Sequence, residues 1–195
     1  MADASESDQA VFLTATAAFD CEEQPDVFEH TDEAGEPVAD VIVATDRPQD
    51  GATSYSTVGL SNHPLSEMED EYPTRVEIVG ACASDVEYYG DVLATVALNI
   101  RDSTWFPQPG GILPDAIGVH DSDVATKHVL LTPPFIWDDG PHTMYLHDKT
   151  VVFLFALPIS DAEREYADKN GVEALGELLD EHEVDVFDLN RPSVA

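Results

Sequence analysis

The sequence has very little positive charge. It carries 8 lysine and arginine residues against 40 aspartate and glutamate residues, which gives a formal net charge of −32 over 195 residues. Nucleic-acid phosphates and anionic membranes are both bound through basic patches. The composition therefore argues against nucleic acid and against a membrane surface as direct partners. A basic protein is the natural electrostatic complement.

The acidic residues are not gathered in one tail but are spread from Asp3 to Asp188. Repulsion among them destabilises the compact chain at low ionic strength, and dissolved salt screens this repulsion. A surface acidic all over suits a cytoplasm that holds molar salt. We therefore expect an intracellular, halophilic protein, with an ordinary acidic bacterial protein as the alternative.

Cysteine and long apolar runs are also scarce. Cys21 and Cys82 are the 2 cysteines, and they form no Cys-x-x-Cys pair, so neither a disulfide framework nor a zinc cysteine site is indicated. No apolar run approaches the roughly 20 residues of a membrane span. The N-terminus lacks the basic region of a signal peptide. These absences predict a cytoplasmic, soluble domain. We expect it to be monomeric or weakly dimeric and to bind no cofactor.

Catalytic motifs are missing as well. No phosphate-binding loop and no dinucleotide glycine fingerprint occurs. Ser61 lies two residues after Gly59, as in a nucleophile elbow, but His63 stands where the second glycine belongs. The histidines, including the one in His120–Asp123, lack the spacing of a helical metal pair. We therefore predict no enzyme and no metal site. A serine- or metal-dependent hydrolase that uses Ser61 and His63, or His120–Asp123, remains the alternative hypothesis.

An apolar segment at Thr150–Pro158 organises the rest of the chain. Its residues are mostly β-branched or aromatic, without a polar break, which is typical of a strand buried on both faces. Ser160 and Glu163 follow at the spacing of a capping box, so a helix should begin there. The remainder of the chain must cover both faces of this strand.

Periodicity predicts the other elements. Strands are expected at 38–45, 53–60, 75–79, 128–132, 144–147 and 184–189, with the first two paired as a hairpin. Helices are expected at 11–19, 84–100, 160–170 and 172–179, the second opened by a capping box at Ser84–Glu87. Alternation at 75–79 predicts one wet face. Residues 1–8 should fray, and 21–37 should be loop with a short extended piece at Val27–Phe28.

Aromatic side chains gather in proline-rich loops, at Trp105, Phe106, Phe135 and Trp137. Aromatic rings are enriched at protein interfaces, so these loops are candidates for contact with a partner. Closing the ends of the core is the alternative role for the same rings.

Several segments occur in an order that matches a known family. Tyr55–Asn62 has the sequence Y-S-T-V-G-L-S-N, and Arg75–Ile78 precedes a long helix and a Pro-Gly loop. Lys127–Pro134, the buried strand with its two helices, and the closing segment Asp188–Pro192 follow. In this order the chain resembles the suppressor of fused domain from about Thr53 to Val194.

The resemblance implies an α+β fold, with a mixed twisted β-sheet flanked by helices. It places a single suppressor-of-fused-like domain at 38–195, after an N-terminal helix and acidic loop at 1–37. In animals, members of this family restrain a transcription factor by gripping a short peptide between this domain and a second one, which we expect this chain to lack.

Stand-alone microbial members look like immunity proteins that neutralise a toxin domain. The resemblance therefore implies a non-catalytic protein-binding module, an immunity or regulatory factor whose partner is a protein, such as a basic toxin domain. Tyr55 matches the family's aromatic position near the peptide groove, whereas Asn62 stands where the family often has aspartate. With the adjacent histidine and the loop tryptophans, the expected partner-binding residues are Tyr55, Asn62, His63, Trp105 and Trp137.

Overall fold

The computed structural model describes residues 5–32, 34–67, 70–102 and 105–195. The helices are α1 (Glu6–Ala18), α2 (Tyr89–Asp102), α3 (Asp161–Asn170) and α4 (Val172–Glu181), with a 3-10 turn η1 (Leu60–Asn62). The strands are β1 (Asp26–Thr31), β2 (Pro37–Thr45), β3 (Ala52–Val58), β4 (Ser66–Glu67), β5 (Asp70–Glu71), β6 (Thr74–Ala83), β7 (Ile112–Leu113), β8 (His128–Thr132), β9 (Met144–Tyr145) and β10 (Thr150–Ile159).

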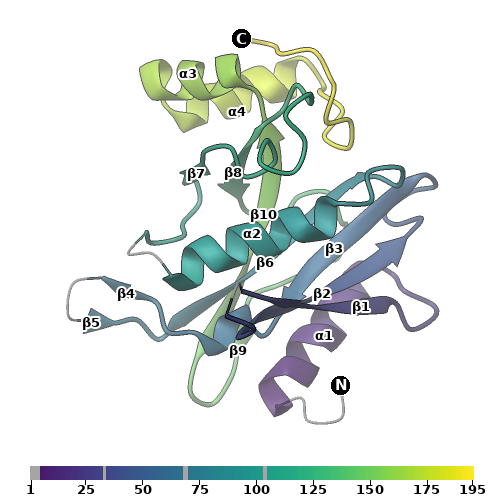
Figure 1. Cartoon of the computed structure of the whole chain (residues 1–195), viewed down its shortest axis with the longest axis vertical. Coiled ribbons are helices and arrows are strands. Elements are labelled where there is room, and N and C mark those ends of the chain that lie inside the picture. Colours follow the sequence, from purple (N-terminus) through teal and green to yellow (C-terminus); the bar gives the residue numbers. More distant parts are fainter. Residues whose placement is uncertain (1–4, 33, 68–69, 103–104) are drawn as a thin grey trace.

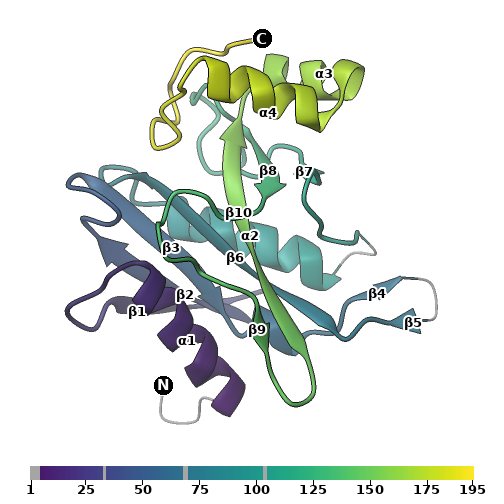
Figure 2. The ribbon, with the colours of Figure 1, turned by 180° about the vertical axis from the view of Figure 1, so that it is seen from behind.

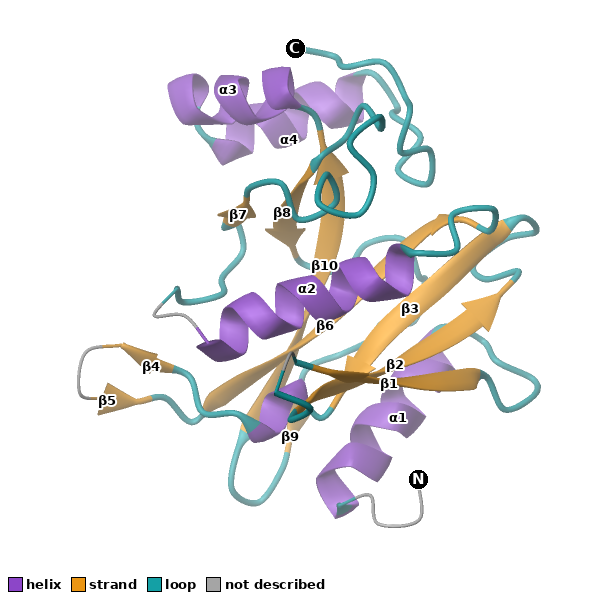
Figure 3. Ribbon diagram, in the orientation of Figure 1, coloured by secondary structure: helices purple, strands orange, loops and turns teal. Residues whose placement is uncertain are grey.

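One mixed sheet forms the centre of the molecule (Figure 1, Figure 3). It is 8-stranded, in the order β1-β2-β3-β6-β10-β8-β7, with β9 paired to β10. β10 runs parallel to β6, and every other pair in this sheet is antiparallel. This confirms the predicted α+β fold, a mixed twisted sheet flanked by helices.

The strand predicted at Thr150–Pro158 is confirmed as β10, in which every residue from Phe153 to Ile159 is buried. The predicted capping box at its end is confirmed too. The hydroxyl of Ser160 accepts from the backbone N–H of Glu163 at 3.2 Å, and the Glu163 carboxylate accepts from the N–H of Ser160 at 2.9 Å.

Helices cover both faces of the sheet. α2 crosses one face in Figure 1, and α1 lies on the opposite face, in front in Figure 2. Because neighbouring residues of a strand point to opposite faces, Val41 of β2 packs in the apolar cluster under α2 and Ile42 packs in the cluster under α1. α3 and α4 lie together at the end toward which β10 runs (Figure 3).

The sheet forks at its centre, and Tyr89 fills the fork. β10 pairs with β6 as far as Phe155 and then continues along β8 alone. Beyond that point the buried hydroxyl of Tyr89 donates to the carbonyl oxygen of Ala156 at 2.9 Å. Gly80 makes room for this ring, because a Cβ at Gly80 would lie 2.9 Å from Cε1 of Tyr89.

The helix start predicted at Ser84–Glu87 is wrong, since α2 begins at Tyr89. Ser84 is held by the β2–β3 hairpin instead. Its backbone N–H donates to the carbonyl oxygen of Gly51 at 2.9 Å, and its hydroxyl lies 2.8 Å from that of Thr53. Because the hydroxyl of Ser84 is hydrogen-bonded to Thr53 of β3, it does not cap the helix that follows.

The strand predicted at 184–189 is also wrong. Asp185 and Asp188 each accept a hydrogen bond from the backbone N–H two residues further on, at 3.0 and 2.8 Å. Such local bonds bend the chain into turns and compete with a strand ladder. The segment meets β6 through a single backbone bond, from the N–H of Ala83 to the carbonyl oxygen of Phe187.

The N-terminal part holds more structure than predicted. α1 begins at Glu6, and Ser5 and Asp8 form a capping box there, so the expected fraying of 1–8 is wrong for this part. β1 runs along β2 over the whole of Asp26–Thr31, where only Val27–Phe28 was expected to be extended. The division of the chain at residue 37 stays a prediction. Among the described residues, no helix combines the length and the apolar character that a membrane span needs.

Candidate functional site

A buried carboxylate joins the two motif segments that precede α2. Glu77 is 0 % exposed on β6. Its Oε1 accepts from the backbone N–H groups of Ser61 and Gly59 at 2.9 and 3.1 Å, and its Oε2 accepts from the hydroxyl of Thr57 at 2.5 Å. The wet face predicted for this strand is therefore wrong, because its polar residue is enclosed by the end of β3 and the turn after it.

The local conformation of the Thr57–Ser61 segment explains how it holds the carboxylate. The hydroxyl of Thr57 also accepts from the N–H of Ile78 at 2.8 Å, beyond the point where β3 and β6 stop pairing. Gly59 has a φ of 98°, in the region that glycine adopts without the steric cost borne by other residues. A threonine, a glycine and a serine at this spacing thus build a carboxylate cradle.

Burial raises the pKa of Glu77 above its ordinary value, and the hydrogen bonds from Thr57, Ser61 and Gly59 act in the opposite direction. The donors fix the carboxylate between β3 and β6. The arrangement holds the two strands together and sets the path of the chain that leads to Asn62 and His63.

Asn62 lies on the surface at the end of this turn and has partners within the chain. Its Nδ2 donates to Oδ1 of Asp8 in α1 at 2.8 Å, and its Oδ1 accepts from Nζ of Lys149 at 2.9 Å. Lys149 also donates to the carbonyl oxygen of Ser61 at 3.1 Å. Asn62 therefore fastens α1 and the start of β10 to the motif turn.

His63 is half-buried and lies in the field of the charges at the end of α2. Partial burial and the positive charge of Arg101 lower the pKa of His63, whereas Asp102 acts to raise it. Arg101 forms ion pairs with Asp32 at 2.7 Å and with Asp102 at 2.6 Å. Its hydrogen bonds lower the pKa of both carboxyls. The His63 ring is therefore neutral over a wider pH range than a free histidine.

The structure does not gather the five predicted partner-binding residues into one patch. Tyr55 is 4 % exposed and packs 5.4 Å from Tyr89 in the cluster under α2, and Trp105, which is half-buried, packs against the same cluster. Trp137 is 6 % exposed in the cluster on the other face, where its indole N–H donates to the hydroxyl of Ser54 at 2.9 Å. Partner binding by these residues stays a prediction.

The geometry gives no support to the hydrolase alternative. Ser61 is 0 % exposed, and no hydrogen bond joins its hydroxyl to a histidine ring. His120 is hydrogen-bonded through Nε2 to the hydroxyl of Thr95 at 2.8 Å. Within the described part of the chain, no group of three or more histidine, cysteine or acidic side chains is arranged to hold a metal ion.

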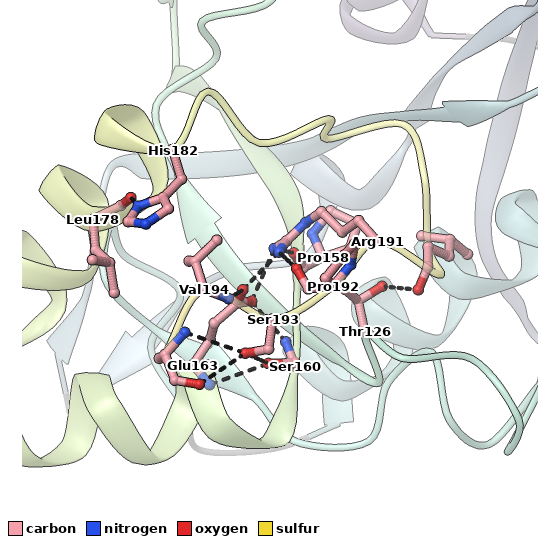
Figure 4. Close-up of polar contacts among 12 residues, drawn as sticks. Thr126, Pro158, Ser160, Glu163, Leu178, His182, Arg191, Pro192, Ser193 and Val194 are labelled. Carbon is pink, nitrogen blue, oxygen red and sulfur yellow. Dashed lines mark hydrogen bonds and ion pairs between the residues drawn. The ribbon is translucent and has the colours of Figure 1, made fainter.

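A second buried carboxylate fastens the closing segment (Figure 4). Arg191 is 3 % exposed, and its guanidinium donates to both oxygens of Glu163, at 2.6 and 2.9 Å, and to the carbonyl oxygen of Pro158 at 3.1 Å. Burial raises the pKa of Glu163, but the bonds from Arg191 and from the N–H of Ser160 outweigh this, and the pKa lies below its ordinary value.

The suppressor of fused (SUFU) family model matches residues 35–192. The chain belongs to this family. The two buried carboxylates explain why its recognisable segments occur together. Glu77 joins the Thr57–Ser61 segment to β6, and Glu163 joins the start of α3 to Arg191.

Relatives of this suppressor of fused chain include an immunity protein. The chain is 37 % identical over 171 residues to the immunity protein YqcF of Bacillus subtilis (strain 168), covering 88 % of this chain and 89 % of that protein. A suppressor of fused homologue from Neisseria gonorrhoeae has a TM-score of 0.69 at 20 % identity, over 97 % of both chains. A chain of the Sufu–Fu complex has a TM-score of 0.74 at 13 % identity, over 96 % of this chain and 92 % of that one. The two structural matches show a shared fold.

Three residues that fasten the motif turn and the closing segment were not among the predicted site residues. They are Glu77, Lys149 and Arg191. Glu77 was hidden because its alternation with Val76 and Ile78 is also the pattern of a half-exposed strand. The available indication was the segment Thr57–Ser61, in which a threonine hydroxyl and the backbone N–H groups around a glycine turn can donate to a carboxylate.

Proposed function

We propose that this chain is an immunity factor that binds a protein toxin in the cytoplasm and blocks its action. The observation that carries the proposal is the 37 % identity to an immunity protein across 88 % of the chain. Membership of the suppressor of fused family over residues 35–192 supports a role in protein binding.

The charge supports a basic toxin as the partner. A formal charge of −32 attracts a basic protein and repels anionic competitors. In dilute buffer this field speeds encounter, but in molar salt it is screened beyond about 3 Å. Short-range contacts then have to supply most of the affinity.

Among the predicted partner-binding residues, Asn62 is exposed and His63 and Trp105 are half-buried, so a partner can reach these three directly. The ring of Tyr55 is buried beside Tyr89 in the α2 cluster and acts by supporting that face of the sheet. Trp137 serves the opposite face in the same way. We therefore assign direct contact to Asn62, His63 and Trp105.

The test is protection from a toxin. The protein encoded beside this chain is expressed in a sensitive host with and without the chain, and growth is measured. Purified proteins are then mixed in molar KCl and analysed by size-exclusion chromatography. We expect growth to be restored and a stable complex to form. Growth arrest that the chain does not relieve, together with separate elution of the two proteins, would overturn the proposal.

A further inference from the structure

A groove beside α4 lies apart from the Glu77 motif. We call it the α4 groove. It has a volume of about 440 Å³, and its walls are the loop Pro133–Phe135, β10 at Leu157, α4 at Gly176 and Leu179, and the chain after α4 at Val184. Figure 2 shows α4 at the end of the molecule where β8 and β10 lie. The volume is within the range of about 300–1,000 Å³ that is common for binding pockets.

An exposed aromatic ring forms one wall of the α4 groove. Phe135 is 57 % exposed. Its ring meets the buried ring of Phe155 edge-on, with centroids 5.1 Å apart, so its position is fixed by the core. Apolar side chains that line a hollow are typical of binding sites.

Glycine at position 176 leaves the groove open. Gly176 lies in the middle of α4, where glycine is less favourable to the helix than alanine. No neighbour demands it, because a Cβ at this position would meet nothing within 4 Å. Gly80 is the opposite case, since its Cβ would collide with Tyr89. Packing explains Gly80, whereas at Gly176 the glycine creates free space.

The charged residues that line the groove are both acidic. Asp180 and Glu183 line it, and its lining contains no lysine, arginine or histidine. The last turn of α4 carries Asp180 and Glu181 but no basic residue. Carboxylates at the negative end of a helix dipole are unfavourable, and cations there are stabilising. A cationic group from outside would relieve this arrangement.

We propose that the α4 groove docks a segment of the protein partner in which a large apolar side chain is flanked by lysine or arginine. The inference rests on the proposed function and names a surface for it. The apolar ring and the space above Gly176 receive the apolar side chain, and Asp180 and Glu183 bind the flanking cations. A second copy of this chain is a poor occupant, because it brings a charge of −32 to an acidic rim.

The first test uses labelled peptides and fluorescence anisotropy in 0.15 M and in molar KCl. The probe is Lys-Lys-Leu-Phe-Leu-Lys-Lys, and its control has serine in place of the three apolar residues. We expect saturable binding of the probe that persists in molar KCl, where apolar contacts remain and surface charges are screened. Equal binding of the serine peptide would mean that charge alone acts, and it would overturn the proposal.

Substitutions locate the binding. Gly176→Leu fills the groove while favouring the helix, and Phe135→Ala removes the aromatic wall; each should weaken probe binding about tenfold or more. The matched controls are Asn99→Leu, which adds an exposed leucine on α2, and Leu13→Ala, which removes a side chain 65 % exposed on α1. Unchanged binding by Gly176→Leu, with its fold verified by circular dichroism, would refute the assignment. The assignment would also be refuted if sedimentation showed a wild-type dimer that Gly176→Leu abolishes.

The last arm separates this inference from the proposed function. Gly176→Leu is tested for protection against the toxin. Loss of protection with Gly176→Leu supports docking in the groove. Full protection by Gly176→Leu would overturn the groove as the docking site and leave the immunity role standing. Failure of the wild-type chain to protect would overturn the immunity role, and the peptide titration would still decide whether the groove binds such a segment.

Discussion

The guanidinium of Arg191 holds both carboxylate oxygens of Glu163, at 2.6 and 2.9 Å, across a separation of 28 residues. Glu163 is the third residue of α3 and belongs to its capping box. Arg191 belongs to the closing segment, two residues before Ser193, whose hydroxyl lies 2.8 Å from that of Ser160 (Figure 4). One buried carboxylate therefore starts a helix and fixes the end of the chain.

Arg191→Ala should destabilise the protein strongly. The substitution leaves Glu163 buried without its cation, and breaking a buried pair from one side typically costs about 3–5 kcal/mol. Urea denaturation in molar KCl, followed by circular dichroism, gives the free energy of unfolding. The control is Lys169→Ala, which removes an exposed pair with Glu165 that contributes little. A loss with Arg191→Ala no larger than that of the control would contradict the buried pair.

Glu77→Gln tests the carboxylate cradle. Glutamine keeps the shape, but its NH₂ group must face donors from Thr57 or from the Gly59–Ser61 turn. A buried donor without an acceptor costs about 1–3 kcal/mol, so the urea midpoint should fall. An unchanged midpoint would mean that the three hydrogen bonds to Glu77 contribute nothing to stability.

The contribution of Glu77 to the stability of the fold should depend on pH in a definite direction. Because the pKa of Glu77 is raised in the folded state, the folded protein binds this proton more tightly than the unfolded chain does. Stability from this group therefore falls as the pH rises from the ordinary glutamate pKa of about 4.3 to the folded value. The pKa of Glu163 is lowered, so its contribution is lost only as the pH falls through the folded value. The wild-type advantage over Glu77→Gln should shrink as the pH is raised; an advantage that grows would contradict the raised pKa.

Local patterns predicted the scaffold well. The apolar run of β10 and the capping box at Ser160 each depend on residues within a few positions, and the structure confirms both. The helix start at Ser84 failed because a contact with Thr53, 31 residues away, engaged the serine first. Sequence periodicity contains no information about such a partner.

The candidate site was less predictable for a related reason. Alternation at Arg75–Val79 is the same whether Glu77 faces water or the three donors at the end of β3 and in the turn after it. Tyr55 and Trp137 were chosen for residue type and family position, and the structure places them on opposite faces of the sheet. Which aromatic residues stay exposed depends on packing between distant segments, as the contrast between Trp137 and Phe135 shows.

Two glycine substitutions should have opposite effects. Gly80→Ala places a Cβ 2.9 Å from Tyr89 and 3.2 Å from Leu93, and overpacking of this kind costs about 1–3 kcal/mol. Gly176→Ala meets nothing within 4 Å and should stabilise α4 by up to about 1 kcal/mol. Thermal melts of both variants beside the wild type measure the difference. A higher melting temperature for Gly80→Ala would show that the packing around Tyr89 can accommodate an added methyl group.

The stability of the whole chain should depend on salt. With 40 acidic and 8 basic residues, folding brings like charges together, and at about 0.01 M salt each charge acts over roughly 30 Å. In molar salt that range falls to about 3 Å, so the repulsion is removed while apolar burial is kept. We expect the melting temperature to rise steadily with KCl and the chain to lose ellipticity in salt-free buffer. An uncharged osmolyte at equal osmolality is the control, because it does not screen charge. Full ellipticity and an unchanged melting temperature without salt would show that the acidic surface is not an adaptation to salt, because self-repulsion would then be too weak to affect folding.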